Sequence, residues 1–202
     1  MLPVDVGTAA VRHARAHAEA EARRSPVGRS PPPPHGLRER RGAFVTLLCD
    51  SELRGCVGYI EPDEPLHAVL ARAARGAARD PRFAPLRPSE LDALRVEVSV
   101  LTPPVALRAP DPELLPELVR VGDHGLIVEA GRRRGLLLPQ VAVEQGFTAA
   151  QFLGATCAKA GLDPDAWRRD GLRWLAFEAE VWEELAPRGP VDRRGGPRPE
   201  TQ

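Results

Sequence analysis

Hydrophobic and polar positions along the chain follow two periods, one typical of strands and one typical of helices. The segment AFVTLLC at 43–49 is rich in β-branched and aromatic residues, and ELRGCVGYI at 52–60 returns after a short polar turn, so the two predict a hairpin. Apolar and polar residues alternate over 95–102, as in a strand with one buried face. By these criteria, strands are predicted at 43–49, 52–60, 95–102, 125–130, 134–138 and 172–184.

Spacings of three and four between apolar residues predict the helices. One begins at Pro65, which suits the first helical position, and extends over 65–80. Another begins at Thr148, where Gln151 completes a capping box, and ends at Gly161. Because helices interleave with strands that are linked mainly by hairpins, we expect an α+β fold with a largely antiparallel sheet and flanking helices.

The 202-residue chain divides into four parts by composition. Residues 1–24 are rich in Ala, Arg and Glu but poor in large apolar side chains, so we expect a helix packed on the surface of the domain. Four consecutive prolines within 25–36 predict an exposed, stiff connector. The α+β domain is expected at 37–185. Residues 186–202 contain no large apolar side chain besides Val191, which predicts a disordered tail.

Charge and cysteine content exclude several classes of protein. Lys and Arg number 28, and so do Asp and Glu, so the chain lacks the basic surplus of a general binder of nucleic acid or anionic membrane. No apolar run approaches the roughly 18 residues of a membrane span, and the first residues lack the pattern of a secretory signal. Three scattered cysteines are too few for a disulfide framework and form no CxxC pair, so we expect a cytoplasmic protein with reduced thiols. The common nucleotide-binding, zinc-protease and serine-hydrolase motifs are absent from the sequence.

The most unusual segment is LRGCVG at 53–58, where a thiol lies between two glycines and close to a guanidinium. Glycine lets the backbone approach a ligand, and Arg54 would lower the pKa of Cys56 and favour the reactive thiolate. In the alternative interpretation, Cys56 is a small core residue, and Gly55 and Gly58 serve packing. The sequence leaves both interpretations open.

Two further segments could complete a site. In DPRF at 80–83, Arg82 either reaches a carboxylate or phosphate of a ligand or pairs with Asp80 and staples the loop. His67 lies in the first turn of its predicted helix, where the helix dipole disfavours the charged imidazole, so it could serve as a base for Cys56.

His13 and His17 stand four residues apart on the predicted N-terminal helix, a spacing that can hold a metal ion. No third ligand lies nearby in the sequence, and the surrounding face is rich in Arg and Glu. We therefore expect a solvated face here and no metal site.

Four segments together make the sequence recognisable. FVTLLCDSELRGCVGYIEPDEPL, AARDPRFAPL, ELDALRVEVSVLTPP and GLLLPQVAVEQGFTAAQFLGATCAKAGLDPDAW resemble, in this order, the AMMECR domain family. The second half of the chain is similar to the prokaryotic branch of that family, the A component of AmmeMemoRadiSam gene sets. The likeness extends from about Thr8 to Glu184. Val57 stands where isoleucine is usual and Phe147 where tryptophan is common, and both preserve apolar bulk.

The resemblance implies a larger and a smaller lobe with a cleft between them. Motif residues are implied to line or support this cleft, and in this sequence they are Arg54, Gly55, Cys56, Gly58, Asp80, Arg82 and Phe83. Gene neighbours in such sets include a radical-SAM enzyme and a Memo-type protein similar to non-haem iron dioxygenases, which suggests a shared pathway. The resemblance names neither a reaction nor a cofactor, because the activity of the family is not settled.

Two hypotheses of function result. In the first, the chain is a cysteine-dependent enzyme or modification factor that acts with the radical-SAM and Memo-type proteins, and Cys56 and Arg54 are catalytic. In the second, it is a non-catalytic module that binds a small anionic ligand or docks onto one of those partners. The expected ligand-binding residues are Gly55, Gly58, Asp80, Arg82, Phe83 and His67.

Overall fold

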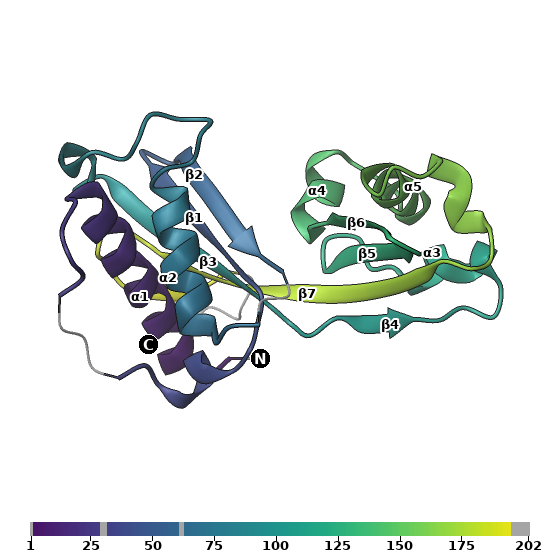
Figure 1. The fold of residues 1–202 in the computed structure, drawn as a ribbon, viewed down its shortest axis with the longest axis horizontal. Coiled ribbons are helices and arrows are strands. Elements are labelled where there is room, and N and C mark those ends of the chain that lie inside the picture. The colour runs from purple at the N-terminus through teal and green to yellow at the C-terminus, as the bar shows by residue number, and fades with distance from the viewer. Residues whose placement is uncertain (1, 29–31, 61–62, 195–202) are drawn as a thin grey trace, which may run out of the picture. The chain divides into compact units, whose positions relative to one another are not determined.

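The structure is a computed structural model that describes residues 2–28, 32–60 and 63–194. The chain folds into two compact units (Figure 1). Unit 1 is formed by the chain up to Leu101 together with the segment from Glu180 onward, and unit 2 by Thr102–Ala179. A larger and a smaller unit were expected, and both are present. The cleft implied by the resemblance stays a prediction.

Helices and strands alternate along the chain. The helices are α1 (Val4–Ala22), α2 (Leu66–Ala77), α3 (Leu115–Leu118), α4 (Pro139–Glu144) and α5 (Ala149–Lys159), with short 3-10 helices η1 (His35–Arg38), η2 (Pro88–Glu90), η3 (Pro112–Leu114) and η4 (Pro164–Arg168). The strands are β1 (Ala43–Cys49), β2 (Glu52–Tyr59), β3 (Leu94–Leu101), β4 (Val105–Leu107), β5 (His124–Ala130), β6 (Arg133–Leu137), β7 (Arg173–Glu184) and β8 (Val191–Arg193).

Among the described residues, the strands pair in the order β2-β1-β3-β7-β5-β6, and β4 and β8 also pair with β7. The pairs β1–β2, β1–β3, β4–β7, β5–β6, β5–β7 and β7–β8 are antiparallel. The predicted α+β fold with a largely antiparallel sheet and flanking helices is therefore confirmed.

The β1–β2 hairpin forms where the pattern predicts it. Asp50 and Ser51 both take positive φ angles, 51° and 68°, as in a tight turn whose twist matches the strands on either side. Strand β1 pairs with β3 along its other edge, and alternate residues such as Val45 and Leu47 are fully buried. Helices α1 and α2 pack on this apolar face and complete the core of unit 1 (Figure 1).

Helix α1 is buried along one face, which differs from the expected surface position. Ala10, Ala14 and Ala18 repeat every four residues, and none of the three is exposed to solvent. Small side chains let α1 approach α2 closely, so this face belongs to the core of unit 1. The scarcity of large apolar residues in α1 thus reflects its close packing against α2.

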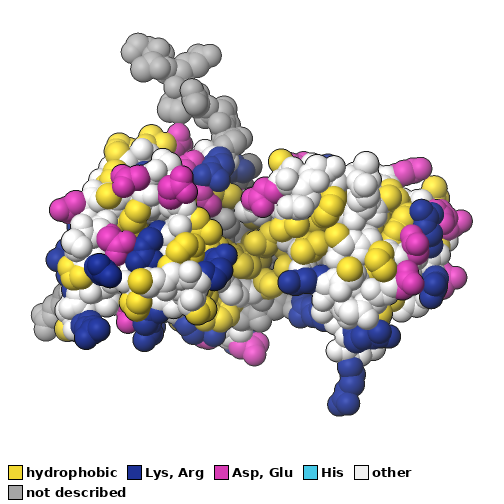
Figure 2. All heavy atoms as spheres, turned by 90° about the horizontal axis from the view of Figure 1, so that it is seen from above, with side chains coloured by type: hydrophobic (Ala, Val, Ile, Leu, Met, Phe, Trp, Pro, Cys, Tyr) yellow, Lys and Arg dark blue, Asp and Glu magenta, His cyan; other side chains and the backbone are white. Residues whose placement is uncertain are grey.

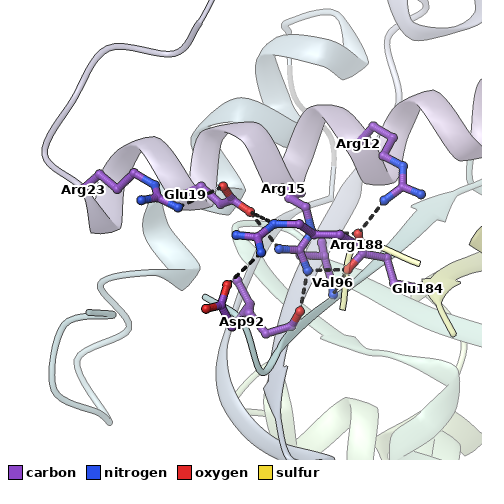
Figure 3. Close-up of polar contacts among 9 residues, drawn as sticks. Arg12, Arg15, Glu19, Arg23, Asp92, Val96, Glu184 and Arg188 are labelled. Carbon is purple, nitrogen blue, oxygen red and sulfur yellow. Dashed lines mark hydrogen bonds and ion pairs between the residues drawn. The ribbon is translucent and has the colours of Figure 1, made fainter. Parts of the chain in front are cut away.

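A buried carboxylate joins α1 to the sheet of unit 1 (Figure 3). Glu184, at the end of β7, has no exposure to solvent and accepts hydrogen bonds from Arg15 at 2.5 and 2.7 Å. Arg12 donates to the same carboxylate at 2.9 Å, and the backbone N–H of Val96 in β3 donates at 3.1 Å. A buried charge is tolerated when it is paired and hydrogen-bonded in this way.

We predict that Arg15 and Glu184 stabilise the fold as a unit. Glu184→Gln should lower the free energy of unfolding by about 3 kcal/mol, because the buried guanidinium of Arg15 then keeps only the partly exposed Glu19 as a counter-charge. Arg15→Met should have a similar effect, and the double variant should lose about 1–3 kcal/mol less than the sum of the two. Chemical denaturation of the four proteins measures this coupling.

The matched control is Glu113→Gln, which breaks an ion pair with Arg168 that is about half exposed on both sides. That loss should stay below about 1 kcal/mol. Additive effects of the Arg15 and Glu184 substitutions would contradict the prediction.

A histidine cluster lies between α1 and α2, where a solvated face was expected. The ring centroids of His13 and His17 are 4.7 Å apart, and Nε2 of His13 lies 2.9 Å from the carbonyl oxygen of His67. Arg75 donates from Nη1 to Nδ1 of His17 at 2.9 Å, so this nitrogen carries no proton. The side chains of His13 and His17 are half-buried. Within the described parts of the chain, no group of three or more His, Cys, Asp or Glu residues could hold a metal ion.

We predict that His17 makes the fold sensitive to acid. Burial, then the neighbouring His13 and Arg75, lower the pKa of His17 to about 4. The unfolded chain takes up a proton near the ordinary pKa of about 6.5, so it binds more protons than the folded chain between these values. The free energy of unfolding should therefore fall as the pH drops from about 6.5 to about 4.

His17→Gln should reduce this fall, which denaturation at pH 7 and pH 4.5 measures. The control is His35→Gln, an exposed histidine outside the cluster, which should leave the difference unchanged. An equal fall in wild type and His17→Gln would contradict the prediction.

Residues 191–194 differ from the disordered tail expected over 186–202. Val191–Arg193 form β8, which is antiparallel to the end of β7, and Val191 packs against the core of unit 1. Arg194 donates to the carboxylates of Glu97 and Glu183. Val191 and Arg194 are enough to order this segment, because the core of unit 1 and the carboxylates of Glu97 and Glu183 supply their contacts. Residues 195–202 of the tail and 29–31 of the proline-rich connector lie outside the described residues.

In unit 2, β7 lies between β4 and β5, and β6 pairs with β5. Helix α5 packs against β5 and β6 (Figure 1). Its predicted capping box is confirmed, since Thr148 and Gln151 each accept the backbone N–H of the other. Neither β4 nor α4 was predicted. Both are short, and Pro103, Pro104 and Pro139 break the apolar pattern around them.

Basic and acidic side chains are interspersed on the face of the molecule that Figure 2 shows. This arrangement agrees with the equal numbers of basic and acidic residues in the sequence. Among the described helices, none has both the length and the apolar composition that crossing a membrane requires.

Candidate functional site

The LRGC and DPRF segments meet because β2 and α2 approach each other closely in unit 1. A Cβ atom on Gly55 would lie 2.1 Å from the carbonyl oxygen of Ala77, the last residue of α2, so only glycine permits this contact. Asp80, three residues after the end of α2, therefore lies close enough to Cys56 to form a hydrogen bond with its backbone N–H.

Asp80 is the buried centre of this arrangement, with 4% of its surface exposed. Its carboxylate accepts the backbone N–H of Cys56 at 3.0 Å and that of Arg82 at 3.1 Å. The guanidinium of Arg82 also donates to it, from Nη2 at 2.7 Å and from Nε at 3.1 Å. The hydrogen bonds from Arg82 hold the pKa of Asp80 well below its ordinary value. Of the two interpretations of DPRF, the structure therefore shows the one in which Arg82 pairs with Asp80 and staples the loop.

A second arginine, Arg54, lies near the ring of Phe83, as Arg82 does. Arg54 donates to both carboxylate oxygens of Glu90, at 2.6 and 3.1 Å. Its Cζ atom lies 6.0 Å from the centroid of the Phe83 ring, and Cζ of Arg82 lies 5.6 Å from it. These distances are at the outer range of cation–π contacts. Each arginine thus has its own carboxylate and shares the half-buried Phe83.

Cys56 is a half-buried thiol whose pKa is raised, mainly by burial. The hydroxyl of Thr46, its neighbour across the hairpin, donates to Sγ at 3.4 Å, and this hydrogen bond and Arg82 oppose the shift. The sequence hypothesis expected Arg54 to lower this pKa. Arg54 is instead engaged with Glu90, and the net direction is the opposite of that expected.

The remaining predicted ligand-binding residues are occupied by contacts within the protein. A Cβ atom on Gly58 would lie 2.3 Å from the ring of Phe44, so glycine is needed there for packing. Nδ1 of His67 lies 3.1 Å from the carbonyl oxygen of Leu37, and no contact with Cys56 is present among the described residues. The structure therefore brings Arg54, Cys56, Asp80, Arg82 and Phe83 together and leaves His67 in the histidine cluster.

Three polar neighbours of Cys56 and Arg54 were missed by sequence reasoning. They are Thr46, Glu90 and Glu97. Glu97 is opposite Thr46 on β3, is 8% exposed and has a raised pKa because of burial. The alternation along 95–102 signals that Glu97 faces away from the apolar core, but no local signal indicates which strand lies beside it.

Comparison with known proteins places the chain in a family. A family model described as AMMECR1 matches residues 11–182. The chain belongs to the AMMECR1 family. It is 50% identical to a protein of Methanopyrus kandleri over 167 residues, which cover 81% of each chain. It is 46% identical to a protein of Methanocaldococcus jannaschii over 195 residues, covering 95% of this chain and 96% of that protein.

A solved structure supports the fold of this AMMECR1-family chain. The crystal structure of an uncharacterised protein from Pyrococcus horikoshii matches with a TM-score of 0.82 and 43% sequence identity. The match covers 96% of this chain and 98% of that one. None of these names states an activity, so the comparisons identify the family and the fold.

The motif residues of this AMMECR1-family chain lie outside three cavities of the structure. These cavities have volumes of about 510, 300 and 720 Å³. None of the three is lined by Arg54, Cys56 or Arg82. Arg82 keeps 57% of its side chain exposed, so this motif residue is accessible at the surface.

We predict that Cys56 stays protonated at neutral pH. Its rate of alkylation by iodoacetamide, resolved by site with mass spectrometry, should rise with an apparent pKa above the ordinary thiol value of about 8.5. Thr46→Val should raise this pKa further, because the hydroxyl of Thr46 stabilises the thiolate. Thr46→Ser keeps the hydroxyl and is the matched control. An apparent pKa below the ordinary value would contradict the prediction and support a reactive thiolate.

Proposed function

We propose that this chain is a non-catalytic protein-docking module, and that it docks through the surface of Arg54, Arg82 and Phe83. The observation that carries the proposal is the state of Arg82, which is 57% exposed while three hydrogen bonds fix its guanidinium to the buried Asp80. A partner that binds a side chain already held in place loses little conformational entropy. Preorganised arginine is therefore suited to recognition.

The residue types around Arg82 are those that contribute most to protein interfaces. Arginine and aromatic side chains dominate interface binding energy. Arg54 and Phe83 provide both types, and the neighbouring Leu53 is 41% exposed. Because Asp80 and Glu90 neutralise the two arginines, the surface offers hydrogen-bond donors with little net charge. It suits a partner that presents a carboxylate or carbonyl oxygen.

The thiolate-enzyme hypothesis has weaker support. A nucleophilic thiol needs a lowered pKa or a base within hydrogen-bond reach. Burial raises the pKa of Cys56, and the hydroxyl of Thr46 donates a hydrogen bond to its sulfur, so Thr46 is not a base for the thiol. In the described part of the chain, neither His67 nor another histidine contacts Cys56.

The partners we propose are the radical-SAM enzyme and the Memo-type protein of the gene sets that the resemblance indicates. Either protein would engage the Arg82 surface through an oxygen acceptor. The cofactor chemistry of the proposed pathway would then belong to these proteins.

We predict that Arg82→Ala weakens binding to the cognate partner by about tenfold or more, the effect expected of an arginine hot spot. Isothermal titration of the full chain with each purified candidate partner measures this. The matched control is Arg79→Ala, which removes a neighbouring arginine that is 61% exposed and pairs with Glu21, and it should leave the affinity unchanged.

Cys56→Ser separates the two hypotheses. For a docking module, this variant should bind the partner and support pathway output as wild type does. Normal binding with lost output would favour the cysteine-dependent enzyme. An affinity unchanged by Arg82→Ala, or no binding of wild type to either partner, would overturn the proposed docking function.

A further inference from the structure

Unit 2 contains a cavity that the proposed docking surface does not use. Its volume is about 510 Å³, within the range of small-molecule sites. Its walls come from β4, the residues after α3, the start of β5 and the middle of β7. All of its lining residues lie between Thr102 and Glu178, so unit 2 builds it alone.

The lining of the cavity includes accessible apolar side chains. Val105 on β4 is 68% exposed, and Leu118 at the end of α3 is 39% exposed. Leu107 adds further apolar surface to the lining. Large apolar side chains exposed together around a cavity provide a surface for the hydrocarbon part of a ligand.

The lining also includes side chains that can donate hydrogen bonds. Arg108 is exposed and makes no ion pair within the described residues. Nδ1 of His124 accepts the backbone N–H of Arg120 at 3.2 Å, so the proton of the neutral ring is on Nε2. Burial of His124 lowers its pKa, which keeps the ring neutral at physiological pH.

The acidic side chain of the cavity is already paired. Glu178 accepts a hydrogen bond from Arg120, which also pairs with Asp123 at 3.3 Å. The backbone N–H of Glu178 donates to the hydroxyl oxygen of Thr102 at 2.8 Å, so the Thr102 proton is free to donate elsewhere. Arg108 is thus the one lining arginine whose charge no described residue compensates.

We propose that this cavity binds a small organic monoanion, a carboxylate attached to an aliphatic or aromatic body. Arg108 pairs with the carboxylate, His124 and Thr102 donate hydrogen bonds near it, and the body lies against Val105 and Leu118. One uncompensated guanidinium matches a single negative charge, whereas a phosphate dianion or nucleic acid needs more. A cation finds no unpaired carboxylate in this lining.

The test titrates hexanoate into the ¹⁵N-labelled full chain and follows amide shifts by NMR. Saturable shifts are expected at Arg108, Leu118 and His124, with a Kd on the order of 1 mM. Acetate lacks the body and 1-hexanol lacks the charge, so each should bind about tenfold more weakly.

Arg108→Ala should weaken hexanoate binding about tenfold and leave 1-hexanol binding unchanged. Arg132→Ala, which removes an exposed arginine at the β5–β6 turn, is the matched control and should bind as wild type. Val105→Asp, a change at an exposed position, should abolish binding by repulsion.

Three results would overturn the proposal: no saturable shifts with hexanoate, equal affinity for hexanoate and 1-hexanol, or unchanged affinity in Arg108→Ala. None of them bears on the docking surface in unit 1, because the two sites share no residue.

Discussion

The geometry of the candidate site depends on one close contact, between Gly55 and the carbonyl oxygen of Ala77. Any larger residue at this position would push α2 away from β2. The approach places Asp80 beside the backbone N–H of Cys56, and the carboxylate then fixes Arg82. In the sequence, Gly55 is a candidate ligand-binding residue. In the structure, it serves the site by letting the loop of Asp80 and Arg82 lie beside Cys56.

Two buried carboxylates use arginine in different ways. Glu184 is fully buried, and the guanidinium of Arg15 beside it is buried as well, so this pair acts within the fold. Asp80 is buried but holds an arginine whose side chain is 57% exposed. The planar guanidinium can donate two bonds to a carboxylate and still offer further N–H groups. This property lets Arg82 be held in place and remain available to a partner.

Contacts between residues close in the sequence could be predicted, and contacts between distant residues could not. Asp80 and Arg82 are two residues apart, and their pairing was one of the interpretations drawn from the sequence. Arg54 and Glu90 are 36 residues apart, and without that contact Arg54 looked like a group that activates Cys56. The pKa of a half-buried thiol depends on all of its neighbours in space, and these come from several elements.

The sequence by itself determined the fold class, most strands and helices, the turn at Asp50, the capping box at Thr148 and the family. These features depend on residues a few positions apart, so periodicity and motifs record them. Only the tertiary structure decided the burial of α1, the pairing of β8 and the partner of Arg54. Each of these depends on segments far apart in the chain, whose packing no local pattern records.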